Sequence, residues 1–162
     1  MPEIICNTSP LQYLHQLGLL HLLPRLAGRV IVPSAVVREL SAGRAQGLDL
    51  PLPEEIEWIT VRTARNAPVI PLVVDLGLGE TEVLALALES ANSEVLLDDA
   101  LARRAAALLG LPFRGTLGLL LDAKRAGLMT AVSPVLDRLK VLGFRLSHDT
   151  QRDVLELAGE NV

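Results

Sequence analysis

Cysteine, aromatic residues and long apolar runs are all scarce in this sequence. The single cysteine, Cys6, excludes a disulfide within the chain and suits a reducing compartment. No apolar run approaches the ~20 residues of a membrane-spanning helix, so no association with a membrane is expected. The first residues, MPEIIC, carry no basic segment, so no signal peptide is expected either. These absences together predict a cytoplasmic protein.

Positive charge is also not in excess, because the formal net charge is −4. The overall charge therefore does not indicate a nucleic-acid-binding protein, although a local basic patch is compatible with it. Aromatic residues make up 2% of the chain, whereas hydrophobic residues, mainly Leu, Val and Ala, make up 50%. Such a composition is typical of helices packed on a buried parallel sheet. The length of 162 residues predicts one domain, spanning 1–162.

Short β-rich segments alternate with helical segments along the chain. Strands are predicted at 3–6, 30–32, 56–61, 94–97 and 112–115. Helices are predicted at 10–17, 19–27, 34–40, 80–90, 100–109, 116–126, 132–142 and 150–158, with loops at 42–55 and 62–76. A hydroxyl of Thr8 or Ser9 ahead of Pro10 is predicted to cap the first helix. This alternation predicts an α/β fold with a parallel sheet flanked by helices.

Polar residues directly follow two of the predicted strands. Asn7 follows 3–6, and Asp98 and Asp99 follow 94–97. In open α/β sheets, ligands bind beyond the carboxyl ends of the strands, so these side chains are candidates for a site. Two other interpretations remain open at this point: Asn7 as a turn residue, and the aspartate pair as the N-cap of the following helix.

The predicted helix at 80–90 carries three glutamates in different helical phases. At about 100° per residue, Glu80 falls in line with the apolar stripe within 83–87. Glu82 and Glu89 fall far from this stripe and are predicted to face water. A carboxylate in line with a buried stripe needs a partner or a metal ion. The alternative for Glu80 is compensation of the helix dipole in the first turn.

Glu39 lies near the margin of the apolar stripe of the predicted helix at 34–40. From there its carboxylate can reach a cleft at the edge of the helix. The alternative is a solvated helix acid, which the phase of the helix does not exclude.

Several chained motifs resemble one known family. IICNTSPL, VIVPSAVVREL, GLGETEVLALALE, VLLDDALARRAAALLG and FRGTLGLLLDAKRAGL occur in this order and extend over nearly the whole chain. In this they resemble the PIN-domain family, and most of all a prokaryotic single-domain subgroup related to VapC-type toxin nucleases. The segment GFRLSHDTQRDVLELAGE resembles the end of that subgroup as well.

The resemblance implies a three-layer sandwich with a central parallel sheet of about four to five strands between helices. It also implies an endoribonuclease that cleaves single-stranded RNA with Mg²⁺ or Mn²⁺, often as the toxin paired with an antitoxin protein, and a homodimer. Asp and Glu without a Cys or His cluster favour such hard ions over zinc.

The resemblance assigns roles to residues by motif. The implied catalytic acids are Glu39, Glu80, Asp98 and Asp99, and the implied metal ligands are Asn7, Glu80, Asp98 and Asp99. Which of the two aspartates faces the metal more directly stays open. The implied substrate-binding residues are Thr8, Ser9, Arg103 and Thr116. Arg103 and Arg104 follow the aspartate pair by about one turn, and ordinary solvated arginines are the alternative for both.

One departure from the family pattern concerns Asn7. The family usually has an aspartate at this place, and an amide oxygen can coordinate a hard cation but carries no charge and cannot act as a base. Metal affinity and activity are therefore expected to fall. This leaves a second function open, a catalytically weakened PIN domain that binds RNA or a protein, and a third, a structural or assembly module.

Overall fold

A central parallel sheet organises the structure, a computed structural model that describes residues 1–65 and 76–160. Its strands are β1 (Glu3–Cys6), β2 (Arg29–Pro33), β3 (Ile59–Arg62), β4 (Ser93–Leu96) and β5 (Phe113–Arg114). The order across the sheet is β3-β2-β1-β4-β5, and each paired neighbour runs parallel. The predicted α/β class and the predicted number of strands are confirmed.

Helices follow most strands and carry the chain back for the next one. They are α1 (Thr8–Gln16), α2 (Leu22–Leu26), α3 (Ser34–Ala45), α4 (Leu78–Glu89), α5 (Ala100–Leu108), α6 (Thr116–Arg125), α7 (Ser133–Val141) and α8 (His148–Leu157), with a short 3₁₀ turn, η1 (Pro53–Glu55). None of the helices in the described part of the chain is long and apolar enough to cross a membrane.

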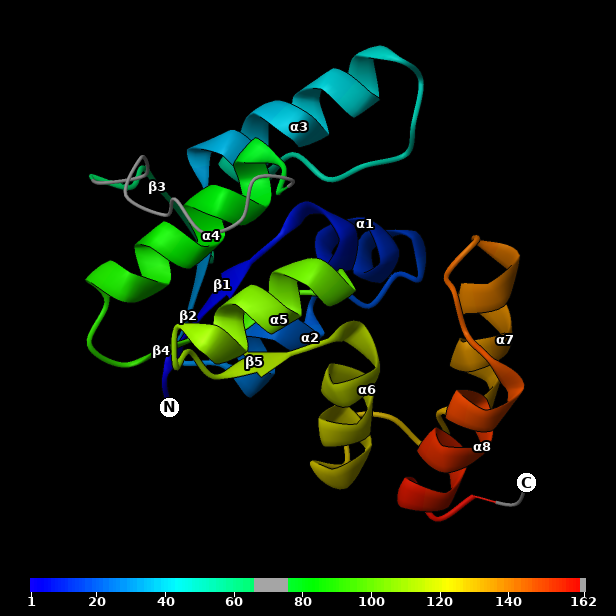
Figure 1. The fold of residues 1–162 in the computed structure, drawn as a ribbon. Coiled ribbons are helices and arrows are strands. Elements are labelled where there is room, and N and C mark those ends of the chain that lie inside the picture. The colour runs from blue at the N-terminus through cyan, green and yellow to red at the C-terminus, as the bar shows by residue number, and fades with distance from the viewer. Residues whose placement is uncertain (66–75, 161–162) are drawn as a thin grey trace.

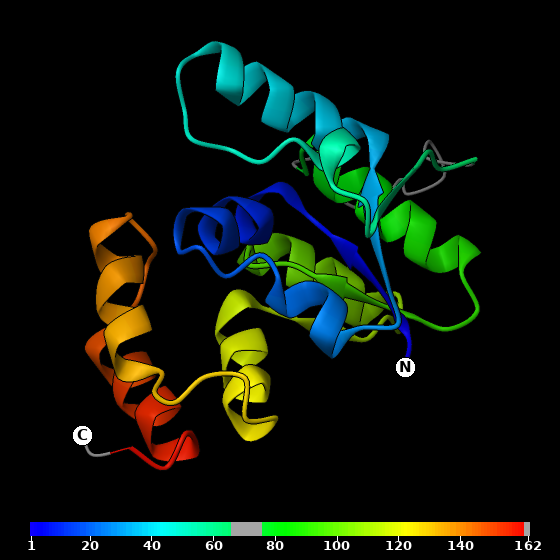
Figure 2. The same ribbon diagram turned by 180° about the vertical axis from the view of Figure 1, so that it is seen from behind.

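The helices form two layers, one on each face of the sheet. The helices α4 and α5 lie over the face that is in front in Figure 1, and α1 and α2 lie over the opposite face, which is in front in Figure 2. The chain changes direction at β1, because β2 and β3 extend the sheet to one side of it and β4 and β5 to the other. The pair α7 and α8 packs beyond this sandwich, where α8 contacts α6.

Aliphatic side chains fill the space between the layers. The central strands are buried on both faces, and Ile4, Ile5, Ile31 and Leu96 are fully buried. Burial of both faces explains why these strands are continuous apolar runs rather than alternating ones. Cys6, at the end of β1, is also fully buried, and burial raises the pKa of its thiol.

Several element boundaries differ from the sequence prediction, among them the end of α3 and the start of β3. The helix predicted at 34–40 continues to Ala45, so the loop predicted at 42–55 begins only after this residue. The presence of Gly43 favoured a loop in the prediction, because glycine is unfavourable in the interior of a helix. In the structure a Cβ at Gly43 would lie 2.4 Å from Leu50 Cδ1, so the glycine makes room for the returning chain. The third strand is Ile59–Arg62 instead of 56–61, and most of the predicted connection at 62–76 lies outside the described residues.

The start of the first helix differs as well. The prediction of a Thr8 or Ser9 hydroxyl cap is wrong, because α1 already begins at Thr8 and Asn7 occupies the N-cap position. Asn7 makes no capping hydrogen bond there. The hydroxyl of Thr8 donates to Glu39 instead, and the side chain of Asn7 faces the carboxyl edge of the sheet.

Candidate functional site

The candidate site lies where the strand order reverses, at the carboxyl ends of β1 and β4. The backbone N–H of Asn7 donates to the carbonyl of Leu96 over 3.1 Å, and Leu97 N–H donates to the carbonyl of Arg114 over 2.9 Å. These bonds extend the ladder past the strand ends. They hold the residues after β1 and the residues after β4 side by side, in the crevice where open α/β sheets bind ligands.

A cavity of about 590 Å³ opens at this edge of the sheet. Its volume is within the roughly 300–1,000 Å³ range of small-molecule sites. We call this cavity the acid pocket, and it is lined by Asn7, Ser9, Tyr13, Glu80, Asp98, Asp99, Ala100, Gly143, Phe144 and Arg145. All four residues predicted as metal ligands therefore reach one cavity, although they come from three separate parts of the chain.

Asn7 contributes a buried polar atom without a partner. The residue is only 4% exposed, and its Oδ1 accepts no hydrogen bond from any residue within 1–65 and 76–160. An unpaired buried amide oxygen costs on the order of 1–3 kcal/mol of folding free energy. A ligand that binds this oxygen in the pocket would remove that cost. Asn7 is therefore not explained by a turn alone.

The two aspartates after β4 have different partners. Asp98 Oδ1 accepts the backbone N–H of Thr116 at 2.8 Å, and Asp98 Oδ2 accepts the Thr116 hydroxyl at 2.6 Å. Burial raises the pKa of Asp98, although both bonds to Thr116 and the charge of Arg103 act to lower it. Asp99 Oδ2 accepts the N–H of Ala102 at 2.9 Å, so Asp99 is the N-cap of α5 while it also lines the pocket. Asp99 can therefore cap α5 and contribute to a site at the same time.

Glu80 lies in the first turn of α4 and is half-buried. Burial raises the pKa of its carboxyl, and the nearby charges of Asp99 and Glu39 raise it further, only partly offset by Gly77 and Asn7. The alignment of Glu80 with the apolar stripe therefore brings it into the acid pocket. The crowding of like charges gives this pocket a physical reason to take up a cation.

Glu39 lies next to the acid pocket but does not line it. Its Oε2 accepts the Thr8 hydroxyl at 2.5 Å, and its Oε1 accepts the Gly79 N–H at 2.9 Å. A Cβ at Gly79 would lie 2.7 Å from Glu39 Oε2, so only glycine permits this approach. Glu39 is exposed, but its carboxylate ties α1 to the start of α4 and so fixes the position of the neighbouring Glu80.

The prediction that Glu82 faces water is wrong. Glu82 is 6% exposed, and its carboxylate accepts hydrogen bonds from the Ser34 hydroxyl, the Ala35 N–H and the Ala64 N–H. The side of α4 opposite its apolar stripe is covered by the start of α3 instead of solvent, and that helix end offers free N–H groups to a carboxylate. These bonds outweigh the effect of burial and lower the pKa of Glu82. Glu89 is exposed, as predicted.

The predicted substrate-binding residues are not all at the pocket. Ser9 lines it, but Thr8 is bound to Glu39, and Thr116 is fully buried behind Asp98. Arg103 lies outside the acid pocket, with its guanidinium carbon 5.2 Å from the centre of the Phe113 ring. Thr8 and Thr116 thus position acids.

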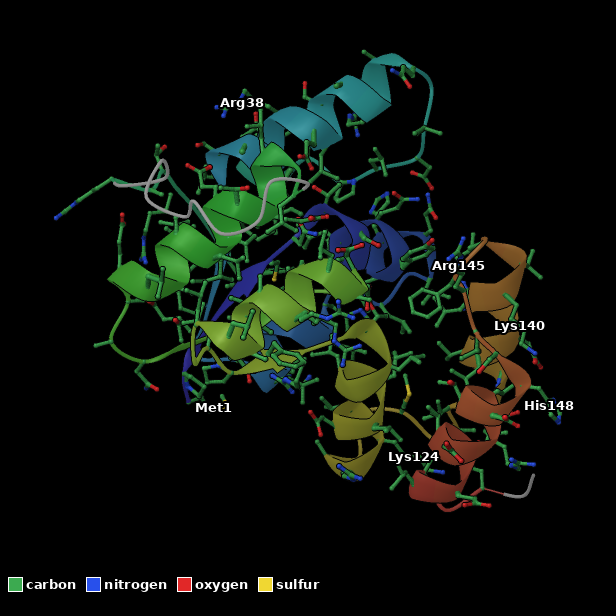
Figure 3. All side chains as sticks on the ribbon, in the orientation of Figure 1. Met1, Arg38, Lys124, Lys140, Arg145 and His148 are labelled. Carbon is green, nitrogen blue, oxygen red and sulfur yellow. The ribbon has the colours of Figure 1, made fainter. Side chains whose placement is uncertain are left out.

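Five residues that line the acid pocket were missed by the sequence prediction, and three of them carry an aromatic or charged side chain. Tyr13, Phe144 and Arg145 line the acid pocket, and Arg145 is labelled in Figure 3 near the connection between α7 and α8. No signal in the sequence placed the segment 143–145 beside residues 7–13.

The donor set of the acid pocket consists of oxygen atoms. In the part of the chain that the structure describes, no three His, Cys, Asp or Glu side chains are grouped closely enough to hold a metal ion by themselves. An ion at this edge would therefore depend on the amide oxygen of Asn7 and on water in addition to the carboxylates. Oxygen-only donors with retained water suit a hard divalent cation such as Mg²⁺ or Mn²⁺.

A comparison with known families agrees with this geometry. Residues 3–160 match the family model described as a PIN domain. No curated protein matches the chain.

Proposed function

The chain belongs to the PIN-domain family, and from this premise we propose that it is a metal-dependent endoribonuclease that cleaves single-stranded RNA. PIN domains are generally nucleases, and they generally use divalent metal ions. The observation that carries the proposal is the unpaired, buried Oδ1 of Asn7 in the same pocket as three carboxylates. That combination is chemically suited to a hard cation, and Mg²⁺ or Mn²⁺ is the proposed cofactor.

In this proposal Asn7, Glu80, Asp98 and Asp99 hold the ion. A divalent ion bound there would polarise the scissile phosphate and lower the pKa of a bound water. Asp98 is kept in place by two hydrogen bonds from Thr116, and Asp99 by its bond to the start of α5. Both aspartates are therefore fixed to the sheet edge before substrate arrives, which favours electrostatic catalysis.

Glu39 and its partners take a supporting role in the proposed reaction. Glu39 does not line the acid pocket, and its bonds from Thr8 and Gly79 tie α1 to the start of α4, so this acid acts by fixing α4. Glu80, on the same turn as Gly79, is then the carboxylate that remains available to the ion or to an attacking water. Ser9 lines the pocket and offers a hydroxyl to a phosphate.

The biological setting is a further part of the proposal. The resemblance of the chained motifs to the VapC-related subgroup supports a toxin role, with an antitoxin protein as partner and a homodimer as the assembly. An immediately upstream reading frame that encodes a small DNA-binding protein would support the toxin role, and its purification with this chain would test the partner.

A second candidate function is favoured by one specific observation. The site draws on a neutral Asn7 where the family usually has an acid, and no three acids within residues 1–65 and 76–160 converge by themselves. A catalytically weakened PIN domain that binds RNA or a protein without cutting it would have this donor set. Cleavage is the measurement that separates the two.

The test is cleavage of single-stranded RNA by the purified chain with Mn²⁺ or Mg²⁺. We expect cleavage that a chelator abolishes and that Glu80→Gln reduces by about 100-fold or more, as for loss of one group that stabilises the transition state. Glu57→Gln, the same change at an exposed residue before β3, is the matched control and should cut normally. Equal activity of Glu80→Gln and the control would reject the assigned site, and wild-type binding without cleavage would favour the second candidate.

A further inference from the structure

Part of the wall of the acid pocket is aromatic and cationic instead of acidic. It is formed by Tyr13 from α1 and by Gly143, Phe144 and Arg145 from the connection between α7 and α8. These residues have no part in holding the ion. Their chemistry raises the question of what lies beside the acids when the substrate is bound.

The aromatic part of this wall is a pair of rings in contact. The ring centres of Tyr13 and Phe144 lie 5.1 Å apart at an interplanar angle of 79°, an edge-to-face arrangement. Both rings are only partly buried, so each keeps surface open to the cavity. They also join α1 to the α7–α8 connection, which fixes the wall against the rest of the fold.

The cationic part of the wall is Arg145. Among the pocket-lining residues that the structure describes, Arg145 is the one cation, and three carboxylates line the same cavity. Arg145 is exposed, and its guanidinium has no hydrogen bond or ion pair within 1–65 and 76–160. By contrast, Arg114 binds Glu94 and Asp122, and Arg62 binds Glu3. An unpaired arginine at the mouth of an anionic pocket is suited to a phosphate group of a ligand.

We propose that Tyr13, Phe144 and Arg145 form a subsite for one unpaired nucleotide beside the acids. The aromatic pair contacts the base, and Arg145 contacts a phosphate next to the one that is cut. This inference deepens the proposed function and rests on it. A base within a duplex has both faces stacked and cannot offer one to a protein ring, so the subsite selects single strands.

The subsite also explains how an acidic pocket retains a polyanion. Carboxylates repel the phosphates that flank the scissile one, and a bound ion serves mainly the phosphate it contacts. The guanidinium of Arg145 attracts a flanking phosphate, and a stacked base adds affinity that salt does not weaken. In a binding experiment, the contact of Arg145 with a phosphate should depend on salt concentration, and the stacking of the base should not.

The experiment measures binding of a fluorescein-labelled, mixed-sequence single-stranded RNA by anisotropy. Every variant carries Glu80→Gln and is measured with a chelator present, so that no cutting occurs. Arg145→Ala is expected to weaken binding about tenfold and to lower the slope of log affinity against log salt by roughly 0.7, the value for one phosphate contact on a single strand. Arg145→Lys should restore the slope. Arg25→Ala, at an exposed arginine of α2, is the matched control and should bind normally.

Phe144→Leu separates stacking from charge. It should weaken binding about fivefold, because stacking of one base on a ring is lost, and should leave the salt slope unchanged. Thermal unfolding of this variant shows whether the wall still packs on α1. If the variant is destabilised, Tyr13→Leu provides the same comparison from the other ring.

The outcomes distinguish this inference from the proposed function. Arg145→Ala that binds RNA like Arg25→Ala, or equal affinity for single strands and for a duplex of the same sequence, overturns the subsite. Arg145-dependent binding by a wild-type chain that does not cut with Mn²⁺ keeps the subsite and rejects the nuclease. Cleavage with an unchanged KM in Arg145→Ala rejects the subsite and keeps the nuclease.

Discussion

Two sets of carboxylates in this molecule differ in the hydrogen-bond donors around them; Glu82 is buried, and Glu160, Glu80 and Asp98 are partly buried. Glu82 and Glu160 each accept N–H groups at the start of a helix, Glu82 at α3 and Glu160 at α7, where Val132 and Ser133 donate. Lys124 also contacts Glu160 at 2.8 Å. Burial acts to raise the pKa of both groups, but these bonds outweigh it and the pKa falls. These acids are ionised and matched with donors.

The acids of the pocket are not matched in this way. Burial raises the pKa of Glu80 and of Asp98, and the bonds that they receive do not outweigh it. Glu80 and Glu82 are two residues apart on one helix, yet they belong to opposite sets. Burial alone therefore does not separate the acids that accept N–H groups at helix starts from the acids of the proposed ion site. The supply of donors around the carboxylate does.

The first way to break this comparison is to remove a matched acid. Glu82→Ala leaves three donors without their acceptor, two of them on the backbone, so the free energy of unfolding should fall by about 3 kcal/mol. Urea unfolding followed by circular dichroism measures it. Glu156→Ala, an exposed acid on α8, should stay within about 0.5 kcal/mol of wild type. A loss for Glu82→Ala no larger than for this control would show that the donors find water instead.

The second way is to add an acid to the unmatched set. Asn7→Asp brings a fourth carboxylate to the pocket, so Mn²⁺ affinity should rise roughly tenfold, because affinity for a hard cation grows with ligand charge. Cleavage should rise with it. Calorimetric titration with Mn²⁺ measures the affinity. Asn92→Asp makes the same chemical change at the opposite edge of the sheet, ahead of β4, and should not alter it. Equal affinities for both variants would remove residue 7 from the ion site.

The sequence predicted the architecture because the signals involved are local. Short β-rich segments marked the strands, and the polar residues after two of them, Asn7 and Asp98, were correctly expected at one edge of the sheet. The position of Glu80 in the pocket followed from helical phase. These inferences need only the period of an element and the rule that parallel strands end at the same edge.

The parts that were missed depend on contacts between distant segments. Phase could show that Glu82 lies away from the apolar stripe of α4, but not that α3 covers that side. Nothing near Arg145 indicated that the α7–α8 connection returns to α1, a pairing that the Tyr13–Phe144 contact makes across the fold. The extension of α3 past Gly43 likewise required the position of Leu50. Tertiary packing, which no local pattern encodes, decided all three.

The smallest effect, and the one that compares both sets directly, is the dependence of stability on pH without metal. Glu80 and Asp98 each have a higher pKa in the folded chain than in the unfolded chain. Between the unfolded and the folded pKa of each group, the folded chain therefore binds more protons. Their contribution to stability is therefore lost as pH rises above their unfolded values of about 4, and Glu80→Gln should remove part of that loss.

Glu82 and Glu160 have a lowered pKa, so their contribution has the opposite sign and is lost as pH falls below the same range. The free energy of unfolding of wild type and of Glu80→Gln is measured with a chelator from acid to neutral pH. As pH rises, the variant should become increasingly more stable than the wild type. Saturating Mn²⁺ should reverse the order at neutral pH, because Glu80 is a proposed ligand of the ion and the wild type should therefore bind Mn²⁺ more tightly than the variant. If the two curves stay parallel over this range, Glu80 is matched by donors after all, and the distinction between the two sets fails at its central residue.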